Sequence, residues 1–184
     1  MFIINLFKNL FKFIFYIIKN LLWLVFGGII HGILWMLLGV IFYALIIIPL
    51  GLVICEITPL GDIVIPFINS LGIVNYESLG EIATPILLFV SIVSSVIFIP
   101  FGNACFKIAF YAFAGTDKEV YVDFASGALD CVWNIFWLPI IGFPVFLVYT
   151  FIGVFLYMTI IGIPLGKRYL NMALLTLLPF GATL

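Results

Sequence analysis

The chain has 184 residues, of which 66% are hydrophobic and 8% are charged, and its formal net charge is −1 at pH 7. Soluble domains carry about 25% charged residues, so 7 basic and 8 acidic side chains cannot cover a water-facing surface of this size. This composition and a mean hydropathy of +1.42 exclude a soluble enzyme, a nucleic-acid-binding protein and a disordered tail. We therefore expect an all-α integral membrane protein with about four membrane segments and additional interfacial amphipathic helices.

Residues 1–19 are predicted to form an amphipathic helix that lies in the membrane interface. Polar side chains recur at steps of one, three and four residues, which places them on one helical face, opposite Phe, Ile and Leu. These polar residues are Asn5, Lys8, Asn9, Lys12, Tyr16, Lys19 and Asn20. A basic face of this kind is typical of a helix that lies among lipid headgroups and binds anionic lipid. The alternative is a first transmembrane span, which would bury three lysines in hydrocarbon.

Three stretches contain no Lys, Arg, Asp or Glu: residues 20–55, 82–106 and 131–166. A span needs about 20 apolar residues, so the middle stretch fits one span. Each outer stretch is too long for one ordinary span and barely long enough for two.

The charges outside these stretches predict the topology. Residues 51–81 contain four acidic residues and no basic one. The positive-inside rule therefore places this segment outside and both termini in the cytoplasm. This topology requires one span in residues 20–50, a return span in 82–101 and a hairpin within 132–163. The hairpin would turn near Gly142–Pro144 or near Thr150–Gly153, and Pro139 and Pro144 favour a re-entrant first arm.

Two short motifs indicate an internal repeat. Asn20-Leu-Leu-Trp23-Leu and Asn134-Ile-Phe-Trp137-Leu each begin a long uncharged stretch. An Ile-Pro-Leu/Phe-Gly element occurs at residues 48–51, at 99–102 with Pro100 and Gly102, and at 163–166 with Pro164 and Gly166. We interpret this element as a span stopped by proline and glycine, followed by a helix along the cytoplasmic interface.

The repeat predicts the domain organisation. An N-terminal interfacial helix (1–19) precedes a first membrane repeat (20–115), which contains an acidic outer loop (51–81). A cytoplasmic linker (116–130) leads to a second, parallel repeat (131–184). An alternative aligns the first copy on residues 48–51 and treats 62–102 as an insertion.

These features resemble the YccF family of bacterial inner membrane proteins, which are built from two inner membrane component domains. The resemblance is clearest at Asn134-Ile-Phe-Trp-Leu and at Ile160-Ile-Gly-Ile-Pro-Leu-Gly166, followed by Leu178-Pro-Phe-Gly181. It covers residues 131–184 well and 20–115 more weakly. It implies an inner (plasma) membrane location, a two-repeat fold and no established activity.

His31 is the only histidine, and it lies four residues before Trp35 within an uncharged stretch. An ionisable residue inside a membrane helix is a functional candidate, because its polarity needs a partner or water. The local sequence resembles the pore helix of the influenza proton channel family, with Leu38 in place of an aspartate. That resemblance implies a gate in which imidazole titrates and Trp35 caps it. The alternative is a neutral histidine bonded to a neighbouring helix.

Small and hydroxyl side chains mark two further faces. Gly28, Gly32 and Gly39 share one helical face and are predicted to allow close helix packing. Ser91, Ser94 and Ser95 share a face of the 82–101 span. Their hydroxyls either bond carbonyls of their own helix or face a wet pore.

The tryptophans and asparagines of the repeated motif are predicted to lie at the membrane interface. Trp23, Trp133 and Trp137 are expected to form an aromatic belt at the cytoplasmic interface. Asn20 and Asn134 either cap helices or cross-link the two repeats through amide hydrogen bonds.

Two functions are consistent with this sequence. No catalytic, cofactor or metal site is expected, because one histidine cannot form a His-based zinc site and no nucleophile has a base beside it. The first hypothesis is a homo-oligomeric channel or transporter-like pore, with His31, Trp35 and the serine face lining it. The alternative is a structural or accessory membrane subunit that binds anionic lipid or a partner protein.

The predicted topology can be tested by cysteine labelling after the three native cysteines are replaced. A membrane-impermeant thiol reagent should label Ser70→Cys from outside the cell, and Asp117→Cys only from the cytoplasmic side. The physical reason is that the basic segments stay on the side where they are synthesised. Reversed or equal labelling of the two positions would contradict this topology.

Overall fold

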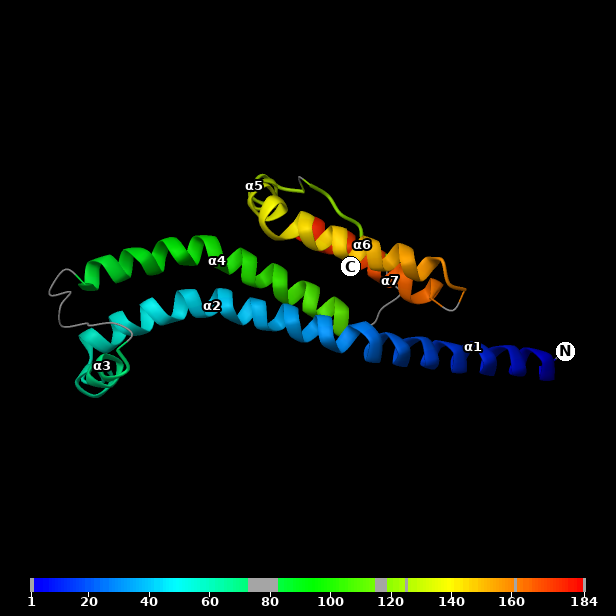
Figure 1. The fold of residues 1–184 in the computed structure, drawn as a ribbon, viewed down its shortest axis with the longest axis horizontal. Coiled ribbons are helices and arrows are strands. Elements are labelled where there is room, and N and C mark those ends of the chain that lie inside the picture. The colour runs from blue at the N-terminus through cyan, green and yellow to red at the C-terminus, as the bar shows by residue number, and fades with distance from the viewer. Residues whose placement is uncertain (1, 73–82, 115–118, 125, 161, 184) are drawn as a thin grey trace. The chain divides into compact units, whose positions relative to one another are not determined.

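The chain folds into helices, as the composition predicts. A computed structural model describes all residues except 1, 73–82, 115–118, 125, 161 and 184 (Figure 1). The elements are α1 (Phe2–Trp23), η1 (Leu24–Gly28), α2 (Ile29–Ile57), α3 (Gly61–Ser70), α4 (Ala83–Ala114), α5 (Ala128–Trp137), η3 (Leu138–Gly142), α6 (Phe143–Tyr157) and α7 (Ile163–Leu177). The described ranges contain no β-strand, so the prediction of an all-α protein is confirmed.

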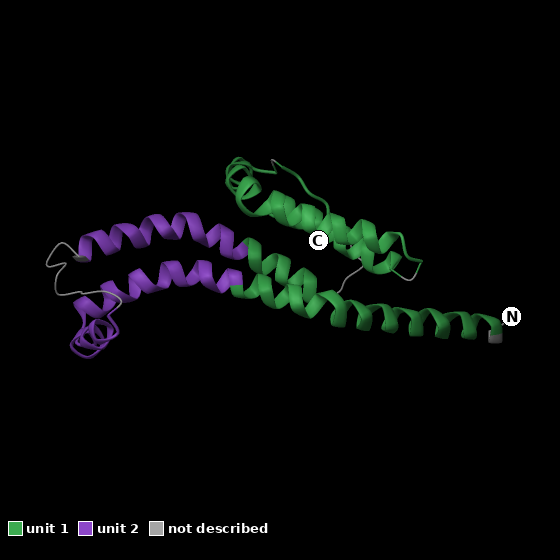
Figure 2. Ribbon diagram, viewed as in Figure 1, with its two compact units in different colours: residues 1–37, 104–184 green, residues 38–103 purple. Residues whose placement is uncertain are grey.

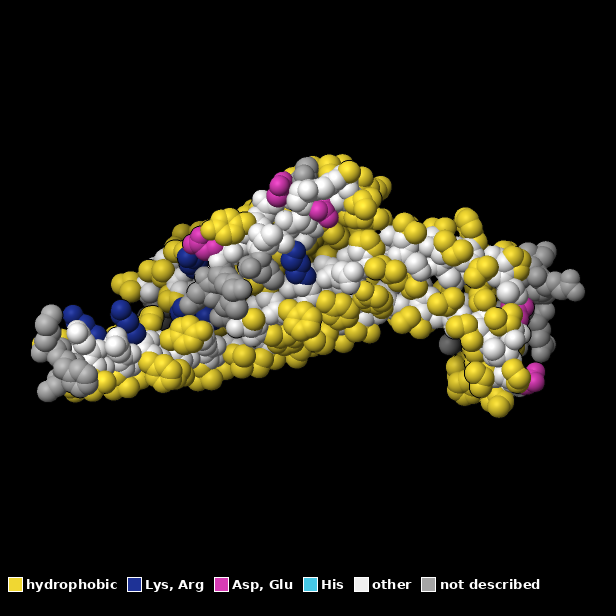
Figure 3. Space-filling model, turned by 180° about the vertical axis from the view of Figure 1, so that it is seen from behind, with side chains coloured by type: hydrophobic (Ala, Val, Ile, Leu, Met, Phe, Trp, Pro, Cys, Tyr) yellow, Lys and Arg dark blue, Asp and Glu magenta, His cyan; other side chains and the backbone are white. Residues whose placement is uncertain are grey.

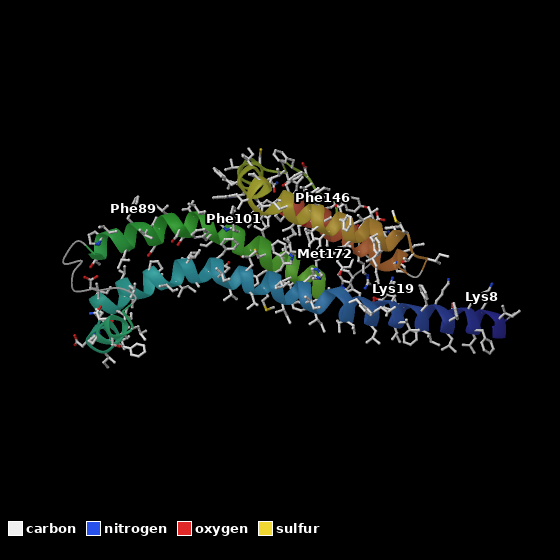
Figure 4. The ribbon with its side chains drawn as sticks, viewed as in Figure 1. Lys8, Lys19, Phe89, Phe101, Phe146 and Met172 are labelled. Carbon is white, nitrogen blue, oxygen red and sulfur yellow. The ribbon has the colours of Figure 1, made fainter. Side chains whose placement is uncertain are left out.

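Three helical stretches are long and apolar enough to cross a membrane: Ile4–Ile57, Thr84–Ala114 and Ala128–Tyr157. Large hydrophobic side chains are exposed along these stretches, for example Phe89, labelled in Figure 4, which is 67% exposed. Such a surface is stable only against lipid. The protein is therefore a membrane protein.

The N-terminal helix continues further than its sequence pattern predicts. The helix does not break near residues 19–20, because the π-helical turn η1 joins α1 directly to α2. The continuous stretch Ile4–Ile57 has 54 residues, whereas one crossing needs about 20. It is therefore long enough for the lysine-bearing part of α1 to lie outside the hydrocarbon. The interfacial position of residues 1–19 stays a prediction.

The expected hairpin turn near Gly142–Pro144 or Thr150–Gly153 is wrong. The π-helical turn η3 carries the helix past Pro139 and Gly142, so α5, η3 and α6 form one stretch up to Tyr157. A wider turn tolerates the missing proline N–H without ending the helix. The chain reverses between Tyr157, where α6 ends, and Ile163, where α7 begins, and the Gly162 amide donates to the carbonyl and the hydroxyl of Thr159 (3.0 and 3.1 Å). The second arm is α7, which begins at Ile163.

The Ile-Pro-Leu/Phe-Gly elements do not stop their spans. Pro49 lies inside α2 and Pro100 lies inside α4. Membrane helices tolerate internal proline because neighbouring groups satisfy the freed carbonyls. At the third element Pro164 occupies the first turn of α7, where a proline N–H would have no intrahelical partner.

The chain forms two compact units, shown in Figure 2. Unit 1 comprises residues 1–37 and 104–184, and unit 2 comprises residues 38–103, so the boundaries fall inside α2 and α4. The units are not the predicted repeats, which stay a prediction. All described basic residues belong to unit 1, whereas the sequence of residues 38–103 contains four acidic residues and no basic one.

Each unit packs at glycines. In unit 2 a Cβ at Gly102 would lie 2.6 Å from the ring of Tyr43, whose hydroxyl donates to Asn103 (2.7 Å). In unit 1 α6 and α7 lie side by side (Figure 1). A Cβ at Gly166 would lie 2.8 Å from the Gly153 carbonyl oxygen, so these two helices approach as closely as their backbones allow.

Candidate functional site

Two buried tryptophans organise unit 1. Trp23 is 1% exposed and its indole N–H donates to the Ala112 carbonyl near the end of α4 (2.8 Å). Trp137 is fully buried and donates to the Thr176 carbonyl near the end of α7 (2.7 Å). The expectation that both belong to an aromatic belt is therefore wrong, because a belt residue faces the headgroups. Each indole instead satisfies a helix-end carbonyl inside the protein.

A π-helical turn follows each tryptophan. The Ile29 amide donates to Leu24 across η1, and the Phe143 amide donates to Leu138 across η3. Each turn brings a glycine five residues after the tryptophan against its indole. A Cβ at Gly28 would lie 2.9 Å from the Ala112 oxygen, and one at Gly142 would lie 2.8 Å from the Leu177 oxygen. We call this arrangement of tryptophan, π-turn and glycine the Trp–Gly clasp.

The two asparagines of the repeated motif bond different segments, and only Asn20 has the cross-linking role expected for both. The Asn20 side-chain oxygen accepts a hydrogen bond from Arg168 Nη2. The Asn134 side-chain nitrogen donates to the carbonyls of Phe124 (3.1 Å) and Phe180 (2.9 Å). Asn20 thus joins the two predicted repeats, whereas Asn134 joins the start of its own predicted repeat to the linker and to the C-terminal segment.

Arg168 is a residue that the sequence analysis did not single out. It is the only arginine, and it is 2% exposed. Its guanidinium carbon lies 5.6 Å from the ring centroid of Trp23, on which it stacks, and Asn20 fixes one of its nitrogens. The sequence signal that could have identified it is a single arginine next to an apolar membrane segment. A charged side chain that is buried there needs hydrogen-bonding or charged partners.

His31 lies among aromatic rings. Its Nδ1 is 2.8 Å from the Gly27 carbonyl, so this nitrogen carries the hydrogen and donates. Its ring meets Tyr149 edge-on at a centroid distance of 5.1 Å and Tyr169 at 5.5 Å. Trp35 donates to the Tyr149 hydroxyl (2.9 Å) and stacks on Trp137 at 6.0 Å. The structure thus brings His31 and Trp35 together on Tyr149, and the proposed gate stays a prediction.

The serine face bonds its own helix. The Ser91 hydroxyl donates to Leu87 (2.7 Å), and those of Ser94 and Ser95 donate to the Ser91 carbonyl (3.1 and 2.7 Å). These bonds satisfy the hydroxyls without water.

The glycine face is buried along its length. A Cβ at Gly32 would lie 2.6 Å from the ring of Phe113 on α4, and Gly39 is also buried. Gly28 and Gly32 therefore lie where α2 and the end of α4 approach closely within unit 1, as expected of small residues at a helix contact.

Basic side chains gather where α1 meets α7 in unit 1. Figure 3 shows Lys and Arg side chains over α1, whose other edge is hydrophobic, and Figure 4 shows Lys8 and Lys19 on the same side of α1. A hollow of about 200 Å³ is lined by Lys19, Pro164, Lys167, Arg168 and Asn171. We call it the basic hollow.

One rim residue of the basic hollow forms an ion pair. Lys167 Nζ lies 3.1 Å from Oε1 of Glu119. The hydrogen bond from Lys167, followed by its charge, holds the pKa of Glu119 below its usual value. Because both side chains are more than half exposed, the pair contributes little to stability.

Comparison with known proteins identifies one part of the chain. Residues 132–182 match the YccF family, described as an inner membrane component domain. This range contains the second Trp–Gly clasp, α6 and α7, and the match confirms the family resemblance for this segment. No curated protein and no solved structure matches the chain.

The clasp can be tested by adding one methyl group. Gly28→Ala and Gly142→Ala should each lower the free energy of unfolding by about 1–3 kcal/mol, because the new Cβ meets a backbone oxygen that has little freedom to move. Thermal unfolding of the purified protein in mild detergent measures the effect. Gly51→Ala is the matched control, since nothing lies within 4 Å of a Cβ there. Equal melting temperatures for the three variants would contradict the clasp.

Proposed function

We propose that this protein is an accessory membrane protein, without enzymatic activity, whose basic helices bind anionic phospholipid. The observation that carries the proposal is the separation of charge: every described basic residue belongs to unit 1, and Lys19 of α1 lines one hollow with Lys167 and Arg168 of α7. Each lysine or arginine near an anionic bilayer surface contributes about 1 kcal/mol of attraction.

The hydrophobic surface of α1 supports the same function. Phe7, Phe11 and Phe15 are between 54% and 73% exposed, so the helix presents a wide aromatic face beside its lysines. A helix with these two faces binds a membrane surface through both apolar burial and charge. The inner-membrane location and cytoplasmic termini belong to this proposal, because the basic segments then face the leaflet in which anionic lipids attract them.

The two-repeat organisation is part of the proposal, and equivalent contacts support it. A shift of 114 residues relates Trp23 to Trp137 and Gly28 to Gly142, and a shift of 64 relates Ala112 to Thr176. The two indole–carbonyl hydrogen bonds therefore join equivalent positions. The same shifts relate the contact between Tyr43 and Gly102 to that between Tyr157 and Gly166. These pairs favour the alignment of the first copy on residues 99–102 over that on 48–51.

Lipid dependence of stability tests the accessory function. The melting temperature in detergent should rise more with added phosphatidylglycerol than with phosphatidylcholine, because a ligand of the folded state stabilises it. The difference should shrink at high salt, where charges are screened. Equal stabilisation by the two lipids would sink the proposal.

A homo-oligomeric pore is the second candidate, and the observation that favours it is the setting of His31. The imidazole lies in an apolar helix against two tyrosine rings, with Nδ1 already bonded. Its other nitrogen is then the one available to accept a proton. The contacts between Trp35, Tyr149 and His31 would transmit that change to the neighbouring helix.

Proton flux into liposomes tests the pore. Flux should increase as the pH falls if protonation of His31 opens the path. His31→Ala should abolish the pH dependence, Trp35→Ala should weaken it, and Ser94→Leu should block flux if α4 lines the path. The histidine is structural if the wild type conducts nothing or if His31→Ala keeps the same pH profile.

A further inference from the structure

We infer that unit 1 binds one anionic phospholipid at a defined site, with the phosphate in the basic hollow and the acyl chains in the apolar hollows beside it. This inference rests on the proposed function, which requires anionic lipid at the basic helices in general. It adds a binding site formed by α1 and α7.

The basic hollow suits a phosphodiester. Three cationic side chains and one amide line it: Lys19, Lys167 and Arg168 with Asn171. Glu119, which pairs with Lys167, is the acidic group that the described residues place beside them. The described charges therefore leave a positive balance, and charge-assisted hydrogen bonds to phosphate oxygens are stronger than neutral ones.

The buried member of this set is held in place before any ligand arrives. Arg168 is bonded to Asn20 and stacked on Trp23, whose indole is in turn bonded to Ala112. Arg168 is thus held in place beside the hollow that it helps to line, and binding does not have to order it. Lys19 and Lys167 are more exposed and form the rim.

Apolar hollows adjoin the basic one. A hollow of about 370 Å³ is lined by Phe15, Ile18, Lys19, Leu22, Ile160, Pro164 and Leu165, and it shares Lys19 and Pro164 with the basic hollow. A further hollow of about 510 Å³ shares Leu22 and Leu165 with the first apolar hollow and extends to Phe26 and Tyr169. The basic hollow therefore adjoins the first apolar hollow, which in turn adjoins the second.

This order of surfaces selects a phospholipid over a free anion. A free phosphate would use the three cations and gain nothing from the apolar hollows. A phospholipid carries a charged phosphate joined to two hydrocarbon chains. These chains would cover the apolar side chains of Phe15, Ile18 and Leu165 and bury them. Zwitterionic lipid would fill the same apolar hollows, but its own ammonium group offsets the phosphate charge.

Lipid binding to the full-length purified protein tests the headgroup contacts. Native mass spectrometry gives the affinities for dioleoyl phosphatidylglycerol and dioleoyl phosphatidylcholine. Replacing two lysines of the rim (Lys19→Gln with Lys167→Gln) should weaken phosphatidylglycerol binding about thirtyfold, at about fivefold for each charge. The control (Lys8→Gln with Lys12→Gln) removes the same charge from α1 outside the hollow and should change the affinity less than about twofold.

A second pair of variants tests the chain contacts. Ile18→Trp should fill the first apolar hollow and weaken the binding of both lipids, whereas Ile17→Trp should leave binding unchanged. Both isoleucines are about half exposed, but only Ile18 is among the lining residues described for that hollow. Melting temperatures of all variants in lipid-free detergent show whether each one is folded.

The outcomes separate the site from the general function. Equal weakening by both lysine pairs would overturn the defined site while leaving anionic-lipid binding intact. Equal affinity of the wild type for the two lipids would overturn both. Displacement of phosphatidylglycerol by millimolar inorganic phosphate, with Ile18→Trp behaving like Ile17→Trp, would show a free-anion site and overturn the phospholipid.

Discussion

The hydrogen bond from a buried indole to a helix-end carbonyl is the interaction on which unit 1 depends. The last carbonyls of a helix have no intrahelical donor, and the hydrocarbon of a membrane offers no water to donate instead. Each carbonyl left without a hydrogen bond there costs several kcal/mol. Trp23 and Trp137 satisfy one carbonyl each, on Ala112 and Thr176. Lipid supplies little hydrophobic force between helices, so such bonds and close glycine packing have to hold the unit together.

The clasp also positions the groups that carry the functional proposals. The Trp23 ring lies against the guanidinium of Arg168, and the Asn20 side-chain oxygen accepts a hydrogen bond from it. These two contacts hold the only arginine in place on α7. Trp23 also packs edge-on against Tyr169, which in turn meets His31. A change that loosens the clasp would therefore disturb the basic hollow and the imidazole together.

The polar side chains of the two units are bonded differently, which indicates different functions for the units. In unit 2 the serine hydroxyls are bonded to their own backbone, and the segment has no basic residue. In unit 1 charged and aromatic polar groups are cross-linked between helices and open onto hollows. Recognition of a charged lipid therefore fits unit 1, where the cations are already held by the fold.

Composition and periodicity determined the membrane class, the all-helical fold and the basic face of α1, because these depend on sums over neighbouring residues. The repeated Asn-x-x-Trp motif was likewise visible, and residues 132–182 matched the family it suggested. Only the tertiary structure decided that Trp23 is buried, that the chain turns after Tyr157 and that Arg168 lies inside unit 1. The reason is distance along the chain: the carbonyl that receives the Trp23 indole lies 89 residues away. Whether a proline ends a helix, or a tryptophan faces lipid, depends on such partners.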